Sequence, residues 1–215
     1  MNTNPPVIEF FFDCSSPWTY LAFRTLQPLA AQLKADISWR PVLVGGIFNS
    51  VNKGVYSARE DMNSSRNRYV LKDLQDCARE VGVTIVFPPR VFPVNSVKAM
   101  RGCVWIARDA EARGVKNPGL NFIEATFAAY FTRQEDISQD AVLAAICAQS
   151  GIDAEAFLTG IAQPDIKQAL KINTDEAVAR GAFGSPTFFV GDDMYFGNDR
   201  LPLVAAAVKR ATVAH

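Results

Sequence analysis

Residues 7–21, VIEFFFDCSSPWTYL, form the stretch of sequence that decides the fold. The run 7–13 is apolar and aromatic and ends at a polar cluster, which predicts a short buried strand. A helix is expected to follow, because Ser16 is a good N-cap and Pro17 suits the first helical position, where its missing N–H costs nothing. The segment therefore predicts a strand that turns directly into a helix.

The residues that follow extend this unit. An apolar stripe carries the helix to about Lys34, and Ile37 to Leu43 alternates well enough for a second strand. Such a β-α-β unit is normally a right-handed crossover with parallel strands. From Val44 to about Ser65 the pattern is lost among glycines and asparagines, which predicts a long loop of the kind that often carries function.

The middle of the chain is predicted to be a helical block, and the end returns to β structure. Two strands, 186–190 and 194–196, are expected to form a hairpin before a last helix. This order predicts an α/β, thioredoxin-like fold in which an all-helical insertion separates the β-α-β and β-β-α halves. The expected division is a thioredoxin-like domain (1–45 and 180–215), a helical insertion domain (65–180) and a connecting active-site loop (46–64).

Composition argues against several classes of partner. The 22 basic residues balance the 22 acidic ones, so no overall field attracts nucleic acid or an anionic membrane surface. The apolar run 7–12 is too short for a secretory signal or a membrane span. A small-molecule partner is therefore favoured.

The cysteines and the histidine limit the chemistry further. No two of the four cysteines have the two-residue spacing of a metal knuckle or a redox dithiol, which favours a reducing cytoplasm. The one histidine is His215, the last residue, so neither a histidine base nor a histidine metal ligand is expected. The cysteines are Cys14, Cys77, Cys103 and Cys147.

Three segments are candidates for the chemistry. The first, 13–22, is the strand-to-helix turn. In the second, 181–189, Pro186 enters the strand two residues after Gly184 and marks either a cis-proline turn or a plain strand start. The third, 194–201, is a glycine turn that leads into an acidic helix start, which Asn198 or Asp199 can cap. Taken alone, the first and third segments are also typical of ordinary helix capping.

In this order the three segments resemble the kappa-class glutathione transferases and the 2-hydroxychromene-2-carboxylate isomerases. In that family a strand ends in Asp and runs into Ser-Pro-aromatic-Ser-aromatic-Leu, to which residues 10–22 are similar. The resemblance continues through 39–48, 87–88 and 93–96, and so covers nearly the whole chain. It implies a glutathione-dependent enzyme that takes a small aromatic substrate and forms a homodimer.

The resemblance also implies where glutathione binds. Disulfide oxidoreductases of the same superfamily carry Cys-Pro-X-Cys where this chain has Ser16-Pro17-Trp18-Thr19, so the family uses the thiol of glutathione instead. Cys14 lies two residues too early and is expected to be buried. Ser16, the implied catalytic residue, hydrogen-bonds the sulfur. The other implied contacts are Asn49, Asn52 and Lys53 in the loop, Asn95 on the substrate side, Ser185 and Pro186 at the cysteinyl part, and Phe196, Gly197, Asn198 and Asp199 at the γ-glutamyl end.

Three functions remain open at this point. The leading one is isomerisation of 2-hydroxychromene-2-carboxylate to trans-o-hydroxybenzylidenepyruvate by reversible thiolate addition, a step of aromatic catabolism. A kappa-type transferase that conjugates electrophiles is the second. A non-catalytic glutathione-binding module is the third. For Asn49 and Lys53, a solvated loop without ligand contacts is the alternative.

Overall fold

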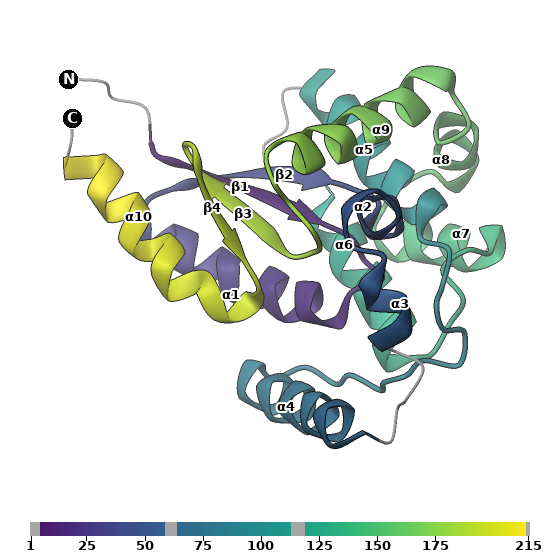
Figure 1. Ribbon diagram of the computed structural model, residues 1–215. Helices are drawn as coiled ribbons and strands as arrows, with labels where there is room; N and C mark the ends of the chain where they lie inside the picture. The colour runs from purple at the N-terminus through teal and green to yellow at the C-terminus, as the bar shows by residue number, and fades with distance from the viewer. Residues whose placement is uncertain (1–4, 59–63, 113–118, 214–215) are drawn as a thin grey trace.

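A four-stranded sheet forms the centre of the computed structural model, which describes residues 5–58, 64–112 and 119–213 (Figure 1). The strand order is β2-β1-β3-β4. The middle strand β1 (Val7–Phe12) runs parallel to β2 (Asp36–Pro41) and antiparallel to β3 (Thr187–Val190). The last strand, β4 (Asp193–Phe196), is antiparallel to β3. The two ends of the chain therefore build one sheet, as the sequence predicts.

One face of the sheet is covered by α1 (Pro17–Leu33) and α10 (Leu201–Val213), which lie side by side in Figure 1. Successive side chains of a strand point to opposite faces. Ile8, Phe10 and Phe12 of β1 consequently share a face, and all three are fully buried in the larger core. The ring of Phe10 stacks on that of Phe188 with 5.0 Å between centroids.

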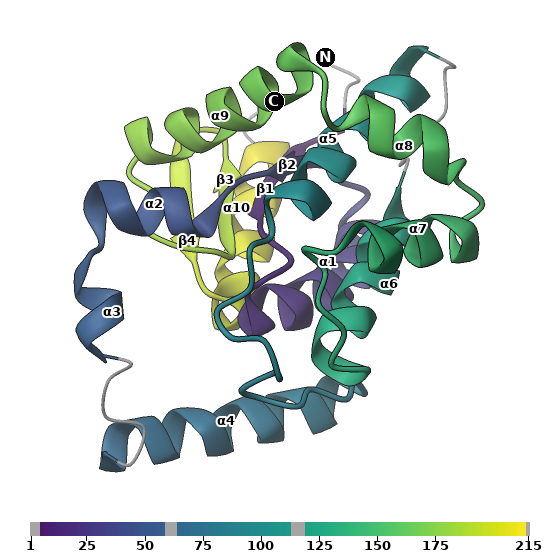
Figure 2. The ribbon, with the colours of Figure 1, turned by 90° about the vertical axis from the view of Figure 1, so that its right-hand side faces the viewer.

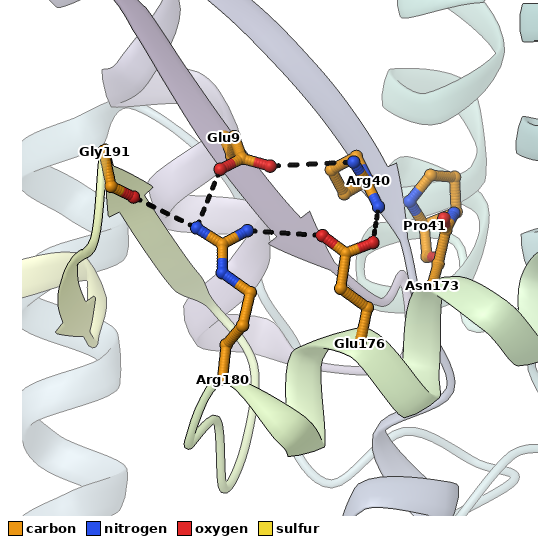
Figure 3. A network of polar contacts seen from close by, with 7 residues as sticks. All are labelled: Glu9, Arg40, Pro41, Asn173, Glu176, Arg180 and Gly191. Carbon is orange, nitrogen blue, oxygen red and sulfur yellow. Dashed lines mark hydrogen bonds and ion pairs between the residues drawn. The ribbon is translucent and has the colours of Figure 1, made fainter.

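The other face carries Phe11 and Phe189, which pack in a smaller core beneath α2 (Val44–Val51) and α9 (Pro164–Ala179). A network of charges closes this core at the end of α9 (Figure 3). Arg180 bonds Glu9 at 2.8 Å and Glu176 at 3.3 Å, and Arg40 pairs with the same two carboxylates. The Arg180 guanidinium also lies 3.7 Å from the Phe189 ring centroid, a cation–π contact.

The predicted helical insertion is present, and along the sequence it separates β1 and β2 from β3 and β4. Its close packing requires glycine at one crossing: a Cβ at Gly160 would lie 2.1 Å from the indole nitrogen of Trp105. None of the described helices has the length and apolarity needed to cross a bilayer. The insertion consists of α4 (Ser65–Val81), α5 (Val97–Ala112), α6 (Leu120–Phe127), the π-helical turn η1 (Ala128–Thr132), α7 (Asp140–Gln149), α8 (Ala154–Gly160) and α9.

The prediction of a loop over 44–65 is wrong for most of that segment, because α2 and α3 (Gly54–Ala58) occupy it. Distant residues stabilise the start of α2. The Leu43 N–H donates to Thr174 Oγ1 at 3.0 Å, and the Val44 N–H donates to Asp13 Oδ2 at 2.8 Å. These tertiary bonds offset the weak helix propensity of a segment rich in glycine and asparagine. Residues 59–63 of the predicted loop, and His215, lie outside the described residues.

Candidate active site

Ser16 is the N-cap of α1, as the sequence predicts. Its Oγ accepts a hydrogen bond from the Thr19 N–H at 3.3 Å and donates one to the Ser185 carbonyl oxygen at 3.0 Å. The Ser185-Pro186 peptide is cis, which confirms the first of the two interpretations of that proline. The hydroxyl therefore lies at the positive end of a 17-residue helix and beside the cis-proline turn.

Ser185 links the two ends of the chain through its own hydroxyl. Its Oγ accepts a hydrogen bond from the Asp13 N–H at 3.1 Å and lies 2.9 Å from the Thr19 hydroxyl. Thr19, which stands where the second redox cysteine of a dithiol would be, is fully buried. Hydroxyl groups thus fill both positions of the redox pair.

Asp13 is a fully buried carboxylate that joins three walls of the site. It accepts hydrogen bonds from the Ser15 N–H at 2.9 Å, the Val44 N–H at 2.8 Å and the Ser96 hydroxyl at 3.0 Å. Burial raises the pKa of Asp13, and these hydrogen bonds oppose the rise. Asp13 holds the α1 turn, α2 and the start of α5 together. The sequence placed Asp13 only at the end of the strand, although an acid that directly follows a buried strand is a usable signal.

A cavity of about 780 Å³ opens beside the Ser16 turn. Its volume is typical of a small-molecule site. Helices α2, α3 and α4 and the connection into α5 line it. In Figure 2, α2 and α3 lie at the left and α4 lies below them. The predicted contact residues that line the cavity are Ser16, Asn52, Asn95, Ser185 and Phe196. The predicted residues outside its lining are Asn49, Lys53, Pro186, Gly197, Asn198 and Asp199.

Several of these residues hold the cavity walls in place. The Asn52 amide donates a hydrogen bond to the Phe183 carbonyl oxygen at 3.0 Å. Asn49 Oδ1 accepts one at 2.9 Å from Tyr56, whose side chain lines the cavity. The Phe196 ring lies 4.3 Å from that of Phe183, measured between centroids.

The turn after β4 differs from the expected helix cap. A short 3-10 turn (Asn198–Arg200) precedes α10. The N-cap of this turn is Gly197, which has no side chain to cap it. Because Gly197 is the N-cap, the predicted cap at Asn198 or Asp199 is wrong at this turn, and the Asp199 carboxylate pairs with Arg200 at 2.9 Å. The Gly197 N–H donates to the Pro186 carbonyl oxygen at 3.1 Å, which keeps this turn beside the cis-proline.

The sequence did not identify much of the cavity wall. The Tyr130 hydroxyl donates to the Val91 carbonyl oxygen at 2.9 Å, and the Phe87 and Phe92 rings lie 5.0 Å apart. Tyr130 and Phe92 come from a helix and a connection whose facing is set by long-range packing, so no local signal marks them, whereas Phe87 lies in a segment that carries the family resemblance. Further cavity residues of this kind are Tyr56, Arg66 and Asn67.

Cys14 is fully buried, as expected. Burial raises the pKa of its thiol well above 9.0, with the neighbouring Cys103 acting in the same direction. The described cysteines are all free thiols. Cys14 is therefore a poor nucleophile, and the hydroxyl of Ser16 is the group presented at the helix start.

Comparison with protein families matches residues 7–209 to the DSBA-like thioredoxin domain. The chain belongs to this family. Among curated proteins, this DSBA-like protein is 27% identical over 206 residues to 2-hydroxychromene-2-carboxylate isomerase of Pseudomonas putida, covering 95% of both chains. It is 28% identical over 215 residues to human glutathione S-transferase kappa 1, covering 95% of this chain and 92% of the relative.

A solved structure agrees with these relatives. A 2-hydroxychromene-2-carboxylate isomerase matches this DSBA-like protein with a TM-score of 0.76 and 25% identity, over 96% of each chain. The resemblance stated from the motifs is thereby confirmed, and so is the thioredoxin-like fold class. The protein is an enzyme of a family that contains isomerases and glutathione transferases.

Proposed function

We propose that this DSBA-like protein is a cytoplasmic, homodimeric, glutathione-dependent isomerase that converts 2-hydroxychromene-2-carboxylate to trans-o-hydroxybenzylidenepyruvate in aromatic catabolism. The observation that carries the proposal is the Ser16 hydroxyl, held at the start of α1 on the wall of a cavity of about 780 Å³. The similarity to 2-hydroxychromene-2-carboxylate isomerases over nearly the whole chain supports the choice of substrate.

The residues at the start of α1 fit the thiol of glutathione. A helix N-terminus stabilises a nearby anion by roughly 0.3–1 kcal/mol, and by up to about 2 kcal/mol when partly buried. A hydrogen bond to a charged group contributes about 1.5–3 kcal/mol more. At about 1.36 kcal/mol per pKa unit, the two effects lower a thiol pKa of about 8.5 by roughly one to four units. Bound glutathione supplies the thiolate that adds reversibly to the conjugated carbon of the substrate.

Ser16 is poised to make that hydrogen bond. Its Oγ is fixed by the Thr19 N–H, while its proton points to the Ser185 carbonyl oxygen. A hydroxyl hydrogen rotates to suit its surroundings, so the proton can turn to a new acceptor while the oxygen stays in place. Ser16 then acts by electrostatic stabilisation and forms no covalent bond itself.

Two parts of the chain form the rest of the site and have different roles. In the proposal, the thioredoxin-like domain (1–45 and 180–215) activates the thiol, and the helical insertion (65–180) supplies the apolar substrate walls. The aromatic side chains of the insertion exclude water and pack against an aromatic substrate. Asn95 lies on the substrate side. The residues proposed to hold glutathione are Asn49, Asn52, Lys53, Ser185, Pro186, Phe196, Gly197, Asn198 and Asp199.

Two measurements test the proposal. Calorimetry with reduced glutathione should show binding, and absence of binding at millimolar concentration would refute the central claim. Chromatography of reactions with 2-hydroxychromene-2-carboxylate should show the trans isomer, formed only with glutathione, which is recovered unchanged. Accumulation of a glutathione conjugate would instead favour a kappa-type transferase, the candidate supported by the human relative. Binding without turnover of any electrophile would favour the non-catalytic module.

A further inference from the structure

A second cavity of about 560 Å³ lies between α2, α5 and α9. It touches the wall of the larger cavity, since Leu43 and Gly46 line both. Figure 2 shows α2 and α9 next to each other at this place. We call this second cavity the α9 groove. Its apolar wall comprises Leu43, Leu170, Val178 and Ala179, and its charged residues are Arg101, Lys167, Lys171 and Asp175.

The charges of the α9 groove do not balance. Asp175 pairs with Lys171 at 2.5 Å. Within the described residues, neither Arg101 nor Lys167 has an ion pair, and Arg101 Nε is buried without a hydrogen-bond partner. Burial of an arginine N–H beside an apolar wall, without an acceptor, costs free energy. Two positive charges are thus left without a carboxylate of the chain.

Around Glu176, near the C-terminal end of α9, the protein pairs its cations within the chain. There, Arg40 and Arg180 share the carboxylates of Glu9 and Glu176, and every partner comes from the chain itself (Figure 3). Arg101 faces the same helix without such a partner. Its positive charge, together with that of Lys167, is available to an anion from outside.

We propose that the α9 groove binds a small organic anion, with its carboxylate on Arg101 and Lys167 and its apolar body against Leu170 and Val178. A guanidinium is suited to a carboxylate because its planar donors match the two oxygens. The volume of the groove lies in the range of small-molecule sites. The apolar wall favours an organic anion over inorganic phosphate. The proposal does not depend on glutathione, because no residue implied in glutathione binding lines the groove.

The test uses 4-bromobenzoate as the probe, in calorimetry and in crystals. Its bromine should give an anomalous peak in the α9 groove, and Arg101→Gln should weaken the binding by at least about tenfold, the loss expected for one charge-assisted hydrogen bond. Lys167→Gln, a change at an exposed lysine, serves as a second variant if Arg101→Gln does not fold. Lys209→Gln on the exposed side of α10 is the matched control and should bind like the native protein.

Other results would overturn the proposal. A bromine peak confined to the larger cavity, or affinity unchanged in both groove variants, would show that the groove is not an anion site. Inorganic phosphate that binds as tightly as 4-bromobenzoate would contradict the assignment to an organic anion. Glutathione binding should be the same in all three variants.

Discussion

Replacement of Ser16 by alanine would separate the two roles of one hydroxyl, which stabilises the turn and, in the proposed function, a thiolate. The variant loses the bond from the Thr19 N–H and the bond to the Ser185 carbonyl oxygen. Loss of an N-cap costs about 1 kcal/mol. The Ser185 carbonyl, in a residue only 7% exposed, then lacks its partner at a cost of about 1–3 kcal/mol. The free energy of unfolding should therefore fall by roughly 2–4 kcal/mol.

The effect on catalysis should be separable from this loss by its pH dependence. Loss of a charge-assisted hydrogen bond worth about 1.5–3 kcal/mol raises the thiol pKa by roughly one to two units. The rate at neutral pH should drop by about tenfold to a hundredfold and should largely return at alkaline pH, where the thiolate forms unaided.

The assay is a pH–rate profile of Ser16→Ala, together with an ultraviolet titration of the bound thiolate and unfolding by urea. Asp153→Ala is a suitable control, because Asp153 caps α8 by accepting hydrogen bonds from the Glu155 and Ala156 N–H groups and does not line the cavity. It should lose about 1 kcal/mol of stability and keep its rate. A Ser16→Ala profile that stays flat and near background to about pH 9.5, a unit above an ordinary thiol pKa, would refute a stabilising role.

Three further predictions concern stability and redox chemistry. Burial raises the pKa of Asp13 above 3.8, so the folded state holds this proton more tightly than the unfolded state. Relative to Asp13→Asn, the native chain should therefore lose stability as the pH rises from about 4 through the folded-state pKa; urea unfolding checks this, and a pH-independent difference would contradict it. Gly160→Ala should lower the unfolding free energy by about 1–3 kcal/mol, because its Cβ would meet Trp105, whereas Gly54→Ala, with open space around it, should be nearly neutral in the same assay. Insulin reduction should show no dithiol–disulfide turnover, and turnover that disappears in Cys14→Ser would overturn this expectation.

The sequence predicts those parts of the fold that local signals mark. The apolar run of β1, the Ser16 cap and the adjacent Pro17 lie within a dozen residues, and the structure keeps each in its expected place. The strands β3 and β4 are marked equally well by their apolar residues and the glycine turn between them. Short-range patterns are sufficient here, because sheet pairing and packing reinforce what the local sequence already favours.

Helix α2 and the cavity wall could not be predicted in this way. The start of α2 depends on acceptors supplied by Asp13 and Thr174, which lie 31 and 131 residues away from their donors. The cavity residues of α4, such as Arg66 and Asn67, face the Ser16 turn only because of how that helix packs in the finished structure. Long-range contacts of this kind leave no period or motif in the local sequence. The predicted division into domains, and the glutathione contacts, stay predictions.

The strand order β2-β1-β3-β4 also bears on how the chain is made. β1 is synthesised first among the strands and lies inside the sheet, between β2 and β3. Of these two neighbours, β3 starts only at Thr187 of the 215 residues. Until that segment leaves the ribosome, β1 has an open edge of unpaired backbone N–H and C=O groups, and such an edge is a template for pairing with other chains. A nascent chain must therefore keep this edge covered while the helical insertion folds. A chain terminated before Thr187 would aggregate rather than form a smaller stable protein.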